Sequence, residues 1–135
     1  MKRNNNIDFQ SVKQPEELEI QTSSIRLVAK CWGNPDGLPV LAFHGGLDNA
    51  ATFDNLAPLL PDLRILSLDL PGHGHSEHRP PGTAYYFIDM VMDIIEVADV
   101  LGLESFSLLG HSMGAGVATY LAGTLQEKID YVILI

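Results

Sequence analysis

The chain has 135 residues, of which 46% are apolar and 19% charged, and its formal net charge is −9. This length allows one ordinary domain, and the composition is that of a globular protein, which excludes wholesale disorder. The negative charge has the wrong sign for holding the phosphates of nucleic acid or of an anionic membrane surface, so we expect neither as a partner.

Compartment signals are few. Cys31 is the only cysteine, so no disulfide can form within the chain. Met1 to Asn6 is polar with no apolar stretch behind it, and no window approaches the ~20 apolar residues of a membrane span. We therefore expect neither export nor membrane insertion, and take a cytoplasmic location as the default.

Residues 1–16 lack periodicity and are rich in Asn and Gln, which predicts a flexible lead-in before a domain over residues 17–135. Leu18–Gln21 and Ile25–Trp32 are β-prone runs on either side of Thr22-Ser23-Ser24. This arrangement is typical of a β-hairpin.

The pattern then changes to an alternation of strands and helices. Val40–Phe43 and Ile65–Leu68 are continuous apolar runs, as expected of strands buried on both faces. Between them, the apolar residues of Ala50–Leu60 recur at helical spacing, which predicts a helix that Pro58 shortens or distorts.

The second half repeats this alternation. Phe87–Leu101 has one apolar and one acidic face, which predicts a helix, and Gly102 would end it. A strand over Phe106–Leu109, a helix over Met113–Gly123 and a strand over Tyr131–Ile135 follow. We predict an α/β fold: a mostly parallel sheet with helices on both faces and an N-terminal β-hairpin, ending at about the sixth strand.

The sharpest motif is Gly110-His111-Ser112-Met113-Gly114, because it matches G-x-S-x-G with a buried strand before it and a helix after it. Such a turn forces the serine into a strained conformation that only small neighbours permit, and it holds the hydroxyl above the sheet edge at the positive end of the helix. The alternative is a glycine-lined turn in which Ser112 merely caps the helix.

A second motif, His44-Gly45-Gly46, follows the Val40–Phe43 strand. Acyl transfer places negative charge on a carbonyl oxygen, and two backbone N–H groups must meet it, one after the nucleophile and one from an earlier loop. Met113 and Gly46 are placed to supply them, and His44, Gly45 and His111 are expected to line the binding site. The alternatives are an ordinary tight turn at Gly45-Gly46 and a structural hydrogen-bonding role for His44.

A third pattern competes with these two. His73, His75 and His78 have the H-x-H-x-x-H spacing of metal ligands and resemble the H-x-H-x-D-H signature of metallo-β-lactamase-like hydrolases. Glu77 stands where that signature has Asp, and no histidine follows His111 to complete a two-metal site. We therefore expect no metal and no cofactor, and keep a metal-dependent hydrolase as the weaker alternative.

Taken together, these segments resemble the α/β-hydrolase fold, and within it the serine-hydrolase-like branch. The resemblance covers roughly residues 18–135 and is carried by Trp32-Gly33, His44 to Ala50, Phe53 to Pro61, Asp69 to Ser76 and Gly110 to Gly116. It implies Ser112 as nucleophile and the N–H groups of Gly46 and Met113 as oxyanion hole. Asp69 and the Gly72–Ser76 turn would shape the sheet and the pocket wall.

The same resemblance implies an acid and a histidine on loops after later strands, and these have no counterpart up to Ile135. We therefore predict a serine hydrolase of carboxylic-ester type, acting on a small, uncharged or modestly apolar acyl substrate, with this chain alone inactive. The alternative is a non-catalytic, truncated fragment or interaction module that associates, with itself or a partner, through the apolar edge strand Tyr131–Ile135.

Overall fold

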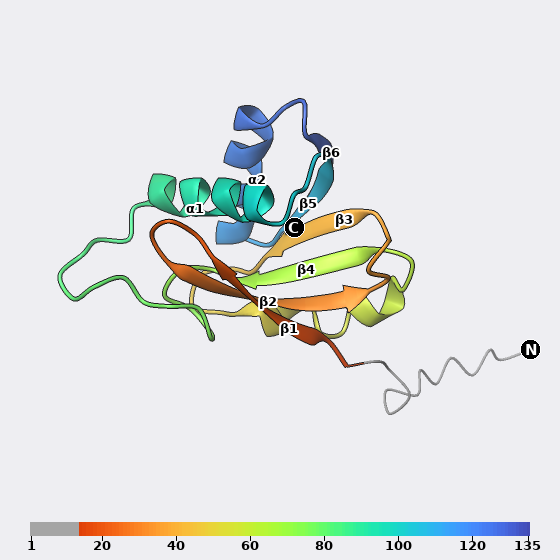
Figure 1. Cartoon of the computed structure of the whole chain (residues 1–135), viewed down its shortest axis with the longest axis horizontal. Coiled ribbons are helices and arrows are strands. Elements are labelled where there is room, and N and C mark those ends of the chain that lie inside the picture. The colour runs from red at the N-terminus through yellow and green to blue at the C-terminus, as the bar shows by residue number, and fades with distance from the viewer. Residues whose placement is uncertain (1–13) are drawn as a thin grey trace, which may run out of the picture.

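The computed structural model describes residues 14–135, and its elements are drawn in Figure 1. Within these residues six strands form one sheet, with two α-helices and two short 3₁₀ helices. Their bounds are β1 Glu16–Gln21, β2 Arg26–Gly33, β3 Pro39–Phe43, η1 Ala50–Phe53, η2 Ala57–Leu59, β4 Arg64–Asp69, α1 Phe87–Val100, β5 Phe106–Gly110, α2 Met113–Thr124 and β6 Ile129–Leu134. Neither α-helix in this part of the chain is long and apolar enough to cross a membrane.

The strand order is β1-β2-β4-β3-β5-β6. β1 and β2 form the predicted antiparallel hairpin, and β2 is also antiparallel to β4, whereas β4, β3, β5 and β6 are mutually parallel. The predicted α/β class is therefore confirmed. Because the carboxyl ends of parallel strands meet at one edge of a sheet, the loops after β3, β4 and β5 gather there.

Most of the predicted lead-in lies outside the described residues. The structure does describe its last residues, and Glu16 already belongs to β1, two residues before the expected start at Leu18. β6 likewise begins at Ile129 rather than Tyr131. The register explains both differences, since Glu16 pairs with Cys31 and Ile129 with Phe106 in the ladders of their neighbours.

The two faces of the sheet are covered differently. α1 and α2 cover one face (Figure 1) and enclose the main core, in which Ile94 and Leu121 pack with strand residues such as Leu41. On the other face a smaller apolar cluster includes Trp32 and Phe53 and is closed by η1 and η2. One face therefore has full helices and the other has only short helical turns.

The predicted single helix over Ala50–Leu60 is wrong. The chain forms η1 and η2 instead, with i to i+3 hydrogen bonds such as Leu60 N–H to the Ala57 carbonyl oxygen at 3.1 Å. Pro58 explains the break, because it has no N–H to donate and its ring would collide with the carbonyl of Asp54 in a continuous α-helix. Asn49 starts η1 by accepting the Ala51 N–H at 2.9 Å through its side-chain oxygen.

α1 forms as predicted, and Gly102 follows it with φ 64°, in the left-handed region that favours glycine. Its buried Asp93 accepts the Ser24 hydroxyl from the hairpin turn at 2.6 Å and is paired with Arg79. Arg79 belongs to the long loop over residues 70–86 that leads from β4 to α1 (Figure 1). α1 therefore fastens both the hairpin and this loop.

Candidate active site

Ser112 stands between the end of β5 at Gly110 and the start of α2 at Met113. Its backbone has φ 52° and ψ −113°, and its side chain is exposed. Among the non-glycine residues that the structure describes, only Ser112 and Leu47 have a positive φ. A non-glycine residue held in this way is strained, and such residues cluster at functional sites.

Two glycines make this sharp turn sterically permissible. A Cβ on Gly110 would collide with the carbonyl oxygen of Gly114, and a Cβ on Gly114 would lie only 2.7 Å from the carbonyl oxygen of His44. α2 can therefore begin directly against the end of β3, which brings the Ser112 turn next to the loop that follows that strand.

The backbone around Ser112 is well tied. Its N–H donates to the carbonyl oxygen of Ile135 at 3.0 Å, and its own carbonyl oxygen accepts the Ala115 N–H at 2.9 Å. The N–H groups of Met113 and Gly46, by contrast, have no hydrogen-bond acceptor in the part of the chain that the structure describes. They remain available to a ligand, while the N–H of Ser112 is not.

The loop after β3 lies against the Ser112 turn. A Cβ placed on Gly45 would be 3.5 Å from Ser112 Cβ and 3.1 Å from His111 Nδ1, and one placed on Gly46 would be 3.8 Å from Met113 Sδ. The two motifs singled out in the sequence are therefore brought together at one sheet edge. A side chain at Gly45 would contact Ser112 and would press on the His111 ring, which would have to shift slightly.

His44 lies behind this loop, with 0% of its surface exposed. Its Nδ1 donates to the Gly45 carbonyl oxygen at 2.6 Å and its Nε2 accepts the Leu70 N–H at 3.0 Å, which is the pattern of a neutral imidazole. Burial lowers the pKa of His44, against the opposing effect of the Gly45 hydrogen bond. His44 therefore fixes the loop and offers no ring nitrogen to a ligand.

His111 is half-buried beside Gly45, and its Nδ1 is buried without a partner among the described residues. It shares the strained turn with the serine, and its backbone N–H donates to the Phe43 carbonyl oxygen at 3.0 Å. The hydroxyl of Ser112 accepts and donates no hydrogen bond within residues 14–135, and the ring nitrogens of His44, His73 and His75 are bonded elsewhere, so no base is in place there.

Asp69, at the end of β4, is buried and organises the neighbouring loops. Its carboxylate accepts the Ala50 N–H at 2.7 Å and the His75 N–H at 2.8 Å, and its carbonyl oxygen accepts the Ser76 hydroxyl at 2.6 Å. Gly74 passes so close to this carboxylate that a Cβ there would collide with it. Asp69 thus joins the start of η1 to the turn over residues 72–76.

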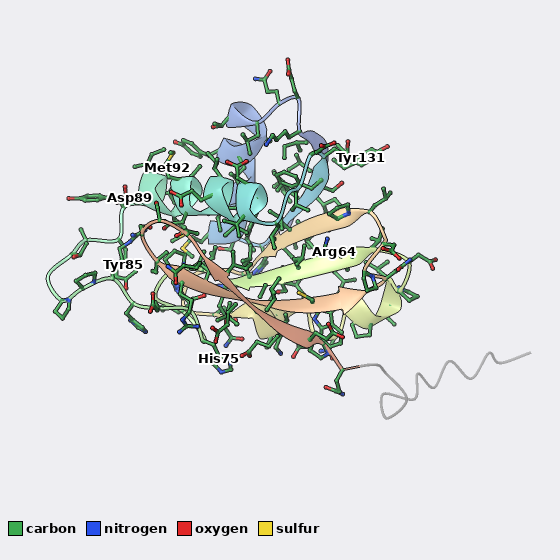
Figure 2. All side chains as sticks on the ribbon, in the orientation of Figure 1. Arg64, His75, Tyr85, Asp89, Met92 and Tyr131 are labelled. Carbon is green, nitrogen blue, oxygen red and sulfur yellow. The ribbon has the colours of Figure 1, made fainter. Side chains whose placement is uncertain are left out.

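The three histidines of the metal-like pattern do not converge. His73 Nδ1 lies 3.0 Å from the Pro71 carbonyl oxygen, whereas His75 Nδ1 lies 2.9 Å from Glu17 Oε2, and Figure 2 shows His75 pointing away from α1 and α2. The hydrogen bond to Glu17 raises the pKa of His75. Residues 14–135 contain no group of three or more His, Cys, Asp or Glu side chains that could hold a metal ion.

A cavity of about 210 Å³ lies at the opposite end of the sheet from Ser112, and its lining includes Cys31, Trp32 and Arg64. Burial raises the pKa of the Cys31 thiol, which keeps it protonated and unreactive. Ser112 itself stands on an open surface. Leu47 in the neighbouring loop was not predicted as a site residue, and the structure shows it strained and exposed. Its only sequence signal is its place directly after two glycines.

Residues 39–135 match the family described as the alpha/beta hydrolase fold. The chain therefore belongs to the α/β-hydrolase fold family. It is 44% identical over 110 residues to a protein of Danio rerio named "Serine hydrolase-like protein", a match that covers 81% of this chain and 34% of the zebrafish protein.

Solved structures agree with this assignment. A hypothetical protein of Pseudomonas aeruginosa is 53% identical with a TM-score of 0.85, and the thioesterase domain from the curacin biosynthetic pathway is 31% identical with a TM-score of 0.85. The matches cover 89% and 91% of this chain but only 43% and 46% of those proteins. The chain therefore spans between about a third and a half of the length of these relatives.

Proposed function

We propose that Ser112 is the nucleophile of a carboxylic-ester hydrolase that acts through an acyl-enzyme. The observation that carries the proposal is the strained, exposed Ser112 beside two backbone N–H groups, those of Gly46 and Met113, that have no acceptor in the described part of the chain. The family membership and the names of the relatives support a hydrolase.

In the proposed reaction, Ser112 Oγ forms a bond to the ester carbonyl carbon and gives its proton to a general base. The carbonyl oxygen becomes negatively charged and is met by the N–H groups of Gly46 and Met113; removing one such donor typically lowers kcat by about 10²- to 10³-fold. Collapse of the intermediate breaks the bond to the alkoxy oxygen, which leaves as an alcohol with that proton. Water then releases the carboxylic acid and restores the hydroxyl.

We place the general base and its orienting acid outside the described residues. Both ring nitrogens of His44 are occupied, and no histidine within residues 14–135 is hydrogen-bonded to the Ser112 hydroxyl. Without a base, the activity that remains is that of the two N–H groups and of binding, on the order of 10³-fold over water. The 135-residue chain by itself is therefore expected to react slowly.

The charges near Ser112 favour an uncharged acyl group. Asp48, in the same loop as Gly46, is exposed, and hydrogen bonds from the Thr52 hydroxyl and the Asn49 N–H lower its pKa, so it is ionised at neutral pH. Its carboxylate repels an anionic substrate that approaches the loop. This supports neutral esters or thioesters over acyl groups that carry a carboxylate.

Labelling with a fluorophosphonate tests this assignment. The reagent should phosphonylate Ser112 with release of fluoride, and peptide mapping by mass spectrometry should find the adduct there and find none in Ser112→Ala. Ser105→Ala is the matched control, because Ser105 is also exposed but its hydroxyl donates to Asp130 at 2.9 Å. Because this chain is expected to react slowly without its base, the rate at Ser112 is compared with the rate at the exposed Ser105. A folded chain in which Ser112 is labelled no faster than Ser105 would refute the proposal.

A second candidate function is association between two copies through β6. β6 is the outer strand of the described sheet, and its apolar side chains are exposed, Tyr131 at 72% and Ile133 at 53% (Tyr131 is labelled in Figure 2). An open apolar edge is a template for pairing with another strand, and two identical edges can pair about a two-fold axis. We propose a second copy as the occupant of this edge.

A further inference from the structure

We propose that Leu47 selects the acyl group that reacts at Ser112, by forming an apolar wall beside the carbonyl site that favours substrates with an aliphatic chain. This inference deepens the proposed function and rests on it. Leu47 is a specificity-determining residue in this account, and it carries no step of the reaction itself.

Within residues 14–135, nothing packs on the Leu47 side chain. Its side chain is fully exposed, at 101% of the reference surface, and its backbone has φ 59°. Leucine is disfavoured in the left-handed region, which glycine and asparagine adopt more readily, and an apolar side chain is disfavoured in water. Leu47 therefore carries both the backbone cost and the cost of an apolar side chain in water, and no packing within the described residues offsets them.

Leu47 follows the loop residues nearest to the Ser112 turn. A Cβ on Gly45 would lie 3.5 Å from Ser112 Cβ, and one on Gly46, which precedes Leu47, would lie 3.8 Å from Met113 Sδ. Leu47 is therefore the next residue after a segment that lies against the Ser112 turn. In this proposal, an acyl chain attached to a carbonyl carbon at Ser112 runs along this loop.

The loop that carries Leu47 is held by hydrogen bonds at both ends. On one side, His44 bonds the Gly45 carbonyl oxygen and the Leu70 N–H. On the other, Asp48 accepts the Thr52 hydroxyl, and the next residues are anchored by the Ala50 N–H on Asp69. A residue placed by a rigid loop can discriminate between substrates, because it does not move aside at low cost.

The test uses two fluorophosphonates, one with a methyl and one with an octyl chain, and measures the rate of Ser112 phosphonylation by mass spectrometry. The readout is the ratio of the octyl rate to the methyl rate. In Leu47→Gly this ratio should fall about tenfold, as expected when a leucine-sized apolar contact is lost. Leu47→Asn should give the same fall although it suits the backbone, whereas Leu47→Met, which keeps an apolar side chain, should keep the ratio.

Leu38→Gly is the matched control, since Leu38 is an exposed leucine that directly precedes β3, at the end of the strand away from Ser112. The ratio of octyl to methyl rates in this variant should equal that of the unmodified chain. An unchanged ratio in Leu47→Gly, or an equal fall in Leu38→Gly, would overturn the role of Leu47 while Ser112 labelling still stood. If neither reagent labels Ser112 faster than the exposed Ser105, the proposed function itself fails, so the two failures are distinguishable.

Discussion

At the scale of single residues, the site depends on where side chains are missing. Gly110, Gly45 and Gly114 each face a neighbour that would meet a Cβ, and together they let the Ser112 turn, the loop after β3 and α2 come into contact. Glycine is used here for close approach, and the strain at Ser112 is held by the hydrogen bonds on both sides of it.

Gly114→Ala tests this packing. The added methyl group would meet the carbonyl oxygens of Phe43 and His44, so the free energy of unfolding in urea should fall by about 1 to 3 kcal/mol. Gly123→Ala in the same helix is the control: nothing lies within 4 Å of its Cβ position, and alanine should stabilise α2 by about 0.5 to 1 kcal/mol. Equal effects of the two substitutions would contradict the close approach at Gly114.

At the scale of elements, α1 holds the hairpin and the loop over residues 70–86 through one buried carboxylate. Asp93 is 4% exposed, accepts the Ser24 hydroxyl and pairs with Arg79, whose backbone N–H donates to the Tyr85 hydroxyl at 2.6 Å. A buried ion pair contributes little compared with an apolar pair of the same size, but removing one partner leaves a buried charge behind.

Asp93→Ala should therefore lower the free energy of unfolding by about 3 to 5 kcal/mol, measured by urea denaturation. Glu96→Ala is the comparison on the same helix: the Glu96 carboxylate also bonds the hairpin turn, at Ser23, but this contact is exposed to solvent, so its loss should lower that free energy much less than the loss of Asp93. The double substitution Arg79→Met with Asp93→Leu should recover most of the loss. If the double substitution does not recover stability, the charge left buried at Arg79 is not the reason why Asp93→Ala is destabilising.

Much of the fold could be predicted from the sequence, because the central parallel strands β3 and β4 contain continuous apolar runs and α1 has clear helical periodicity. The Ser112 motif could be located for a local reason, since a strand, a glycine-flanked serine and a helix follow one another directly. The break between η1 and η2 could not be placed, because the helical spacing of Phe53 and Ala57 persists across it and only Pro58 signals the interruption.

Features that depend on long-range contacts or on unusual backbone conformation could not be predicted from the sequence. The bond between Ser24 and Asp93 joins residues 69 positions apart, and no local pattern encodes it. The left-handed conformation of Leu47 could not be predicted either, because leucine has no preference for that conformation. The occupied ring nitrogens of His44 also follow from tertiary packing alone.

At the scale of the whole molecule, the net charge of −9 and the apolar β6 edge act against each other when two copies meet. Raising salt from about 0.1 M to about 1 M shortens the Debye length from ~10 Å to ~3 Å, so association should strengthen with salt in sedimentation equilibrium. Ile133→Lys on β6 should give a monomer at both salt concentrations.

The control for this prediction is Ile88→Lys on α1, because Ile88 is as exposed as Ile133, at 55% against 53%. Its charge change is identical, but it lies on a different element from β6. If both variants dissociate alike, the loss of association is caused by the added charge and not by its place on β6. A chain that is monomeric without any substitution would rule out pairing through β6.

The central claim is that Ser112 Oγ and the N–H groups of Gly46 and Met113 act on one substrate atom. A crystal structure of the phosphonylated chain tests it most directly. We predict phosphorus bonded to Ser112 Oγ, with the phosphonyl oxygen about 2.7 to 3.1 Å from both nitrogens. A phosphonyl oxygen turned into solvent, or bound to neither N–H group, would contradict the account.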